Sequence, residues 1–378
     1  MDFNLSDEQQ QLRDAVRRYL AQEYGFEARR AIIHGDGTSA AAWQGFAELG
    51  LLGVPVPEAH GGFGGNGVDL MVVMEEFGRA LVVEPYFATA VMSVAFLKAG
   101  GSDAQKAASL PAIAEGRLLM AAALTERQSR HELFNVETRA RVVGDGFVLD
   151  GHKTVVLHGG QAQQLIVSAR SAGDARDLSG LSLFVVPRGH PGVTVSDYRT
   201  IDGMRAADVT LTGVKLPRAA LLGPQGGAWA ILESVARTGA AALVAESIGC
   251  MLAVNDATVE YLKTRKQFGV PIGKFQVLQH RAVEMFMETE QARSLAMLAA
   301  VKVDGADAGA AARAVHAAKA RAAKAGRVVG QSAIQLHGGM GMTDEMAVGH
   351  YFKRLAMIEA TLGDADHHLG AFAALATA

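Results

Sequence analysis

The feature that most constrains the fold is a change of hydrophobic pattern along the chain. Up to about residue 117 apolar residues recur at helical spacing, and from there to about 222 they form short runs rich in Val, Leu and Thr between turn signals. Helical periodicity then returns and persists to the end. Closely spaced strands without intervening helices favour an antiparallel sheet. We therefore predict an α+β multidomain protein with an N-terminal helical domain (1–117), a central antiparallel β domain (118–222) and a C-terminal four-helix bundle (223–378).

Local sequence patterns predict where the helices and strands lie. Ser6 and Gln9 form a capping-box pattern in front of the first helix. Further helices are expected at 43–49, 69–81, 87–98, 103–115, 226–266, 275–303 and 308–337, with shorter pieces past 343. Strands are expected near 136–143, 147–149, 165–168, 183–186 and 209–216.

Composition excludes several classes of function. The 36 Lys and Arg residues face 39 acidic residues, so no basic excess favours nucleic acid or anionic lipid as a partner. The single cysteine, Cys250, lies in an apolar helical run and favours a buried thiol in a reducing cytoplasm over a nucleophile. The start has no signal-peptide pattern, and no uncharged apolar run reaches the roughly 18 residues of a membrane span. We expect a cytoplasmic protein.

The stretch from 261 to 279, YLKTRKQFGVPIGKFQVLQ, combines cations, an aromatic ring and glycines between two helical segments. The pattern predicts that the first helix ends near Gly269, because Pro271 cannot continue it, and that Arg265 and Lys266 lie in its last turn. On spacing alone, this is an ordinary helix end with basic residues near the negative end of the dipole.

Three other features favour structural explanations. The segment GFGGNG at 62–67 satisfies G-x-G-x-x-G, but it has no preceding strand in a βαβ unit, so we expect a connecting loop and no nicotinamide site. The segment DADHH at 364–368 offers two metal ligands at most, and Asp364 as a helix cap explains it more simply. A solvated helix face is expected for four dispersed basic residues: Arg313, Lys319, Arg321 and Lys324.

Several segments carry a resemblance to a known family. RKQFGVPIGKFQVLQ is similar to the R-x-Q-F-G-x-P-I-x-x-F-Q signature of the acyl-CoA dehydrogenases, which are flavoenzymes. The likeness extends from DFNLSDEQQQLRDAVRRYL near the start, through PEAHGGFGG, to QLHGGMGM at 335–342. It implies the same order of helical, β and helical domains, FAD as cofactor, an acyl-CoA substrate and electron-transfer flavoprotein as the electron acceptor.

The resemblance also implies which residues contact FAD. In the family, the R-x-Q-F-G and glycine-rich segments contact the FAD of a neighbouring subunit, and a threonine-glutamate loop lies near the flavin. The positions that match are Arg265, Gln267, Phe268, Gln335, Gly338, Gly339 and Thr125. A guanidinium suits phosphate, and glycine permits close approach of the backbone. The alternative for QLHGGMGM is a glycine cap of a helix.

The catalytic base of the family is missing at both positions where its members carry one. The family reaction removes the α proton of an acyl thioester with a carboxylate, while the β hydrogen leaves as hydride to the flavin. Leu362 stands where the family's E-G-T motif has glutamate, and Gly239 stands at the alternative position in the first bundle helix. Loss of a general base costs about 10² to 10⁴ in rate.

The flavin wall also departs from the family pattern. The T-E-P-G-A-G-S-D loop resembles TERQSRHE at 125–132, which keeps Thr125 and Glu126 but loses the glycines and serine. In the K-x-W-I-T segment, which matches 153–157, Val155 and Leu157 replace the tryptophan and threonine that lie against the isoalloxazine. The alternative is a family member that builds its pocket differently.

Two hypotheses follow. The chain is an acyl-CoA dehydrogenase with a base elsewhere, such as Glu359, Asp364 or Glu246, in a homo-oligomer. Alternatively, it is a catalytically silent subunit that shares a cofactor with a larger homologous subunit, because it keeps the residues for a neighbour's FAD and lacks those for its own. The segments TERQSR, HYFKRL and LGDADHHL resemble in particular a small subunit of a hetero-oligomeric member, which favours the second hypothesis.

Overall fold

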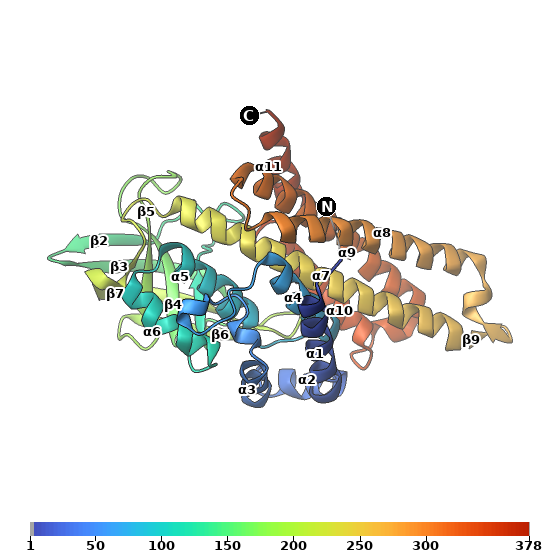
Figure 1. Cartoon of the computed structure of the whole chain (residues 1–378). Coiled ribbons are helices and arrows are strands. Elements are labelled where there is room, and N and C mark those ends of the chain that lie inside the picture. The colour runs from blue at the N-terminus through green and yellow to red at the C-terminus, as the bar shows by residue number, and fades with distance from the viewer. Residues whose placement is uncertain (1–3, 378) are drawn as a thin grey trace. The chain divides into compact units, whose positions relative to one another are not determined.

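The computed structural model describes residues 4–377, which form two compact units. The first unit combines Met1–Ala31, Asn66–Val82 and Ala240–Ala378, and the second combines Ile32–Gly65 and Val83–Gly239. The order of elements is helical, then β, then helical (Figure 1), which confirms the predicted fold class. The predicted domain boundaries at 117 and 222 stay a prediction.

Long helices make up the first unit. The capping box of Ser6 and Gln9 opens the first of them, as predicted, and Asp307 caps another by accepting a hydrogen bond from the backbone of Ala310 at 2.9 Å. Two of the helices, α2 and α7, continue into the second unit. The helices are α1 (Asp7–Glu23), α2 (Phe26–His34), α4 (Gly67–Ala80), α7 (Trp229–Thr264), α8 (Gln276–Lys302), α9 (Ala308–His337), α10 (Ala347–Ala360) and α11 (Ala365–Thr377).

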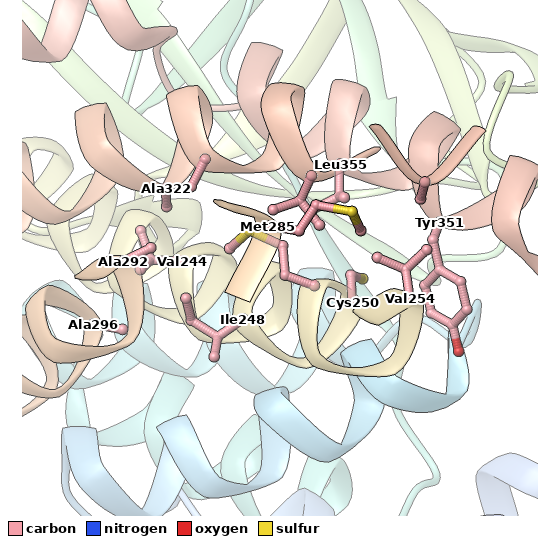
Figure 2. Close-up of a cluster of buried hydrophobic side chains, with 14 of the residues drawn as sticks. Val244, Ile248, Cys250, Val254, Met285, Ala292, Ala296, Ala322, Tyr351 and Leu355 are labelled. Carbon is pink, nitrogen blue, oxygen red and sulfur yellow. The ribbon is translucent and has the colours of Figure 1, made fainter. Parts of the chain in front are cut away.

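Apolar side chains from four helices meet in the bundle core (Figure 2). Ile248 and Val254 of α7, Met285 of α8 and Leu355 of α10 are buried there, together with small residues of α9. Cys250 is buried in the same cluster, as expected for a structural thiol. By length and composition α7 could cross a membrane, but 72% of its most apolar window is buried inside the protein, as in a central bundle helix.

The second unit contains the β-sheet and several short helices. Its helices are α3 (Ala40–Glu48), the π-helix η3 (Phe87–Ser93), α5 (Val94–Gly100), α6 (Asp103–Ala114) and the 3₁₀ turns η1 (Leu51–Gly53), η2 (Glu58–His60) and η4 (Arg218–Ala220). Its strands are β1 (Met120–Ala123), β2 (Arg139–Val143), β3 (Gly146–Leu157), β4 (Gln164–Arg170), β5 (Leu181–Pro187), β6 (Val193–Arg199), β7 (Arg205–Pro217) and β8 (Leu221–Leu222).

The sheet is mainly antiparallel, as predicted. Its order is β6-β7-β3-β2-β4-β5-β8, and β1 pairs with β4 in parallel, with Met120 opposite Gln164. A parallel pair between Arg139 and Arg170 joins β2 to β4. Its core includes Phe147 and Phe184, whose rings meet edge to face at 4.9 Å. The long strands β3 and β7 lose register between Lys153 and Val156, which marks a bulge.

Candidate functional site

The segment that ends α7 forms a small hairpin at one end of the bundle (Figure 1). The helix ends at Thr264, and β9 (Lys266–Gln267) pairs with β10 (Val270–Pro271). Phe268 and Gly269 form the turn with positive φ angles of 53° and 77°, as a two-residue hairpin requires. The prediction that the helix ends near Gly269 with Arg265 and Lys266 in its last turn is therefore wrong, because the helix ends at Thr264 and strand pairing begins at Lys266.

The hairpin exposes the side chains that the resemblance assigns to FAD. Phe268 is 92% exposed, and its ring meets Phe275 edge to face at 6.1 Å. Arg265 and Gln267 are also exposed. Within residues 4–377, the guanidinium of Arg265 has no ion pair. A cation and an aromatic ring therefore face outward, where they can meet the phosphate and base of a nucleotide.

The glycine-rich segment follows the end of α9. Gly338 opens the 3₁₀ helix η6 (Gly338–Met342) with φ 59° and ψ −139°, a conformation that favours glycine. A Cβ at Gly338 or Gly339 would meet no atom within 4 Å, so both face open space. Gln335, one turn earlier, is exposed. The segment ends the helix, as its structural interpretation predicts, and it also leaves room for a ligand beside the backbone.

A contact between two rings brings these segments together. Tyr261 of α7 stacks on His337 of α9 with ring centroids 4.4 Å apart and planes inclined by 27°. The Tyr261 hydroxyl donates to the backbone carbonyl of His337 at 3.3 Å. Burial lowers the pKa of His337, so its ring in the stack is neutral at neutral pH. One end of the bundle thus presents the side chain of Arg265 and the bare backbone of Gly338 and Gly339, which suits an anionic dinucleotide such as FAD.

The carboxylates that could replace the missing base are engaged elsewhere. Glu246 forms a buried two-point ion pair with Arg354, at 2.6 and 2.7 Å. Glu359 accepts a hydrogen bond from Arg327. Asp364 caps α11 through the backbone N–H of His367 at 2.8 Å, as the sequence predicted. These contacts hold all three carboxylates in structural roles.

The two base positions carry no acid. Leu362 lies half-buried between α10 and α11 with φ 56°, a left-handed conformation that is uncommon for leucine. Gly239 is buried within α7. The bundle therefore holds no carboxylate at either position.

In the second unit, a buried ion pair organises the loop that contains Thr125. Lys153 Nζ donates to Glu126 Oε1 at 2.6 Å and to Ser168 Oγ at 3.0 Å, and Glu126 also accepts from the backbone of Glu137 at 2.7 Å. Burial alone would raise the pKa of Glu126, but the Lys153 ammonium and the hydrogen bonds lower it to about 2. Burial lowers the pKa of Lys153 to about 8, against the opposing charge of Glu126. The pair stabilises the loop from within the sheet.

The segment expected to form a flavin wall is strained and half-exposed. Val155 lies in the bulge with φ 51° and is 48% exposed, although a β-branched residue rarely adopts this conformation. Its backbone N–H donates to Asp208 Oδ1 at 3.2 Å, and the Tyr198 hydroxyl donates to the same oxygen at 3.1 Å. The hydroxyl of Thr125 donates to the Thr154 carbonyl at 2.5 Å, so it serves its own backbone.

Sequence reasoning missed the contacts that fix these segments. The expectation of a solvated face is wrong for Lys319, which is 1% exposed because its ammonium donates to backbone carbonyls in the last turn of α10 and just after that helix. Tyr261 with His337, and Tyr198 with Asp208, pair across strands or helices, and no local pattern signals such pairs. Among residues 4–377, no group of three or more His, Cys, Asp or Glu could hold a metal ion. The GFGGNG segment forms a loop that leads into α4.

Comparison with known proteins assigns the family. Three acyl-CoA dehydrogenase family profiles match the chain, the N-terminal domain at 6–117, the middle domain at 121–214 and the C-terminal domain at 226–375. A probable acyl-CoA dehydrogenase of Bacillus subtilis, YngJ, is 31% identical over 97% of both chains. Butyryl-CoA dehydrogenase from Megasphaera elsdenii is 25% identical with a TM-score of 0.91 over 100% of each chain. The ChsE4-ChsE5 complex from Mycobacterium tuberculosis shares the fold, with 24% identity and a TM-score of 0.91 over 100% of this chain and 99% of that one. Together, the helical, β and helical order, the R-x-Q-F-G hairpin and these matches place the chain in the acyl-CoA dehydrogenase family of flavoprotein oxidoreductases.

Proposed function

We propose that the chain takes part in the FAD-dependent α,β-desaturation of an acyl-CoA thioester, as a subunit of an oligomer that passes its electrons to electron-transfer flavoprotein. FAD, when bound, accepts the hydride from the β carbon of the substrate. The contribution of this chain is to bind and orient the nucleotide part of FAD on a neighbouring subunit. Arg265, Gln267 and Phe268 of the hairpin carry it.

The single observation that carries this proposal is the stack of Tyr261 on His337. It brings the hairpin and the glycine-rich segment to the same exposed end of the bundle. In this arrangement Arg265 pairs with the diphosphate, and Gly338 and Gly339 let the backbone approach the same cofactor. Gln335 adds an exposed amide one turn away.

A second candidate function is that of a catalytically silent, cofactor-sharing small subunit. Leu362 and Gly239 occupy the base positions, and Glu246, Glu359 and Asp364 are engaged in structural contacts. The resemblance of TERQSR, HYFKRL and LGDADHHL to the small subunit of pimeloyl-CoA dehydrogenase supports this candidate. The shared fold with a chain of the ChsE4-ChsE5 complex is consistent with it. The partner is then a larger homologous subunit, the substrate a dicarboxylic or medium-chain thioester, and the location the cytoplasm.

Replacement of Arg265 by alanine tests the shared nucleotide site. A charge-assisted hydrogen bond contributes roughly 1.5–3 kcal/mol, so Arg265→Ala should raise the Kd for FAD of the assembled oligomer about tenfold or more. Flavin fluorescence during dilution of the complex measures this change. Lys263→Ala, an exposed cation two residues earlier, is the matched control and should leave FAD binding unchanged. Equal FAD retention in both variants would contradict the proposal.

A further inference from the structure

The buried ammonium of Lys319 binds backbone carbonyls at the loop that stands where the family has its base motif. Lys319 Nζ lies 2.9 Å from the carbonyl oxygen of Ile358, 3.1 Å from that of Glu359 and 2.6 Å from that of Gly363. An ammonium has three donors, and each can serve one carbonyl. Two of these carbonyls are in the last turn of α10, where a cation also answers the helix dipole.

His368 of α11, which contacts His316 of α9, binds the same loop. His368 is buried, and burial, with the nearby charge of Lys319, lowers its pKa to about 3, so its ring is neutral. Its Nε2 lies 2.9 Å from the carbonyl oxygen of Leu362, which can only accept, so this nitrogen donates. Its Nδ1 is then an acceptor, and His316 of α9 donates to it at 2.8 Å. The two elements that pack against the loop thus both donate into it.

These bonds restrict the backbone at residue 362. The carbonyls of Leu362 and Gly363 both point to donors inside the bundle, while Leu362 has φ 56° and Gly363 has φ 111°. A Cβ at Gly363 would lie 2.6 Å from the rings of His367 and His368, so only glycine fits. A leucine in the left-handed region is strained and persists only where its surroundings fix it. The donors of Lys319 and His368 therefore occupy the carbonyl groups of the loop and fix its backbone.

Burial of the lysine charge is itself unfavourable. Burial lowers the pKa of Lys319 to about 7, although Glu359 and Asp364 oppose this change. The carboxylate of Glu359 is engaged by Arg327, and three further titratable groups, His316, His367 and His368, lie around the loop. A buried ammonium at this cost needs well-placed acceptors, which the three carbonyls provide.

We propose that Lys319 and His368 are positioning residues, which hold the loop at 361–363 so that the side chain of residue 362 faces the bound acyl thioester. The second part of this inference rests on the proposed function, because the resemblance equates position 362 with the base of the family. The first part concerns this chain alone. Neither Lys319 nor His368 contacts the thioester; both act through the backbone of residues 362 and 363.

A spin label at position 362 tests the inference directly. Cys250 is buried, so Leu362→Cys offers a single reactive thiol, and Leu369→Cys on the exposed face of α11 offers a matched control. We expect a motionally restricted spectrum at 362. Lys319→Met, which keeps the stem and removes the donors, should add a mobile component at 362 and leave the spectrum at 369 unchanged. A spectrum at 362 that Lys319→Met leaves unchanged, in a folded protein, would overturn the proposal.

Histidine variants keep the test decisive if Lys319→Met does not fold. His368→Leu removes the donor to residue 362 and should add the mobile component, whereas His368→Gln keeps an N–H donor and should restore the restricted spectrum. Equal spectra for these two variants would also overturn the proposal. Octanoyl-CoA, added to the assembled oligomer, should shift the spectrum at 362 and not at 369. If the lysine and histidine effects hold but octanoyl-CoA has none, the loop-positioning claim stands, and the assignment of position 362 to the thioester site fails.

Discussion

At the scale of single residues, the ion pair of Lys153 and Glu126 shows how a retained motif can have a structural role. The sequence predicted that Thr125 and Glu126 survive from a flavin-facing loop, but both groups turn inward to their own backbone and to Lys153. The pairing joins a loop residue to a residue of β3 that lies 27 positions away, so local patterns cannot predict it. Breaking a buried pair by removing one partner costs roughly 3–5 kcal/mol, because the other charge stays buried without compensation.

The ion pair of Lys153 and Glu126 should make the free energy of unfolding depend on pH. The folded protein lowers the pKa of Glu126 to about 2 from its ordinary value of 4.5, so the carboxylate contributes stability that is complete above pH 4.5 and is lost as the pH falls toward 2. Glu126→Gln should abolish this part of the loss in the free energy of unfolding, measured by urea denaturation between pH 6 and 2. Glu132→Gln, which alters a more exposed ion pair, is the control. Parallel pH curves for Glu126→Gln and the parent protein would show that the pair does not stabilise the fold.

Restoring an acid at the base position tests whether the chain has a working pocket of its own. We expect that Leu362→Glu in the isolated chain gives no turnover of an acyl-CoA with an artificial electron acceptor, because Val155 and Leu157 still replace the flavin wall. The measurement is dye reduction under saturating FAD and substrate. Substantial rescue would show that the pocket is competent and that only the carboxylate is missing.

Among the secondary-structure elements, the bounds of long helices could be predicted from local signals, but elements defined by pairing with a distant segment could not. The bounds of α8 and α9 match the prediction closely, because caps such as Asp307 and the break at Pro271 are local signals. The predicted helix at 87–98 is in part a π-helix, and α2 and β6 were missed. β6 alternates exposed and half-buried residues, so only its pairing with β7 defines it.

The exposed apolar face of helix α8 indicates an interface with another chain. Met285, Ala292 and Ala299 face the bundle core, yet the other side exposes Val283, Phe286 and Met287 by more than half. A helix that is apolar on both sides is normally covered on both. We expect Phe286→Glu to lower the mass of the purified oligomer in light scattering without a change in circular dichroism.

A control distinguishes this interface from a general effect of added charge. Ile201→Glu places the same charge at an exposed apolar position of the second unit and should leave the mass unchanged. An oligomer that tolerates Phe286→Glu would mean that α8 is not at the interface.

At the scale of the whole molecule, the order of hydrophobic patterns predicts the fold class, and the motifs predict the family. The R-x-Q-F-G segment indicates the family, whereas the hairpin that it forms was not predicted. What the sequence could not predict is the convergence of distant groups. Tyr261 meets His337 across 76 positions, and Lys319 meets Gly363 across 44, and both contacts depend on how long helices pack.

We propose that the chain offers contacts to the FAD of a neighbouring subunit and lacks the wall and base for a flavin of its own. The number of flavins per chain, measured by absorbance on the chain purified alone and then on its assembled oligomer, tests it most directly. We predict well below one FAD per isolated chain and no turnover of acyl-CoA. The assembled oligomer should bind FAD, and Arg265→Ala should lower its affinity for FAD. One tightly bound FAD per isolated chain, together with turnover, would contradict the claim.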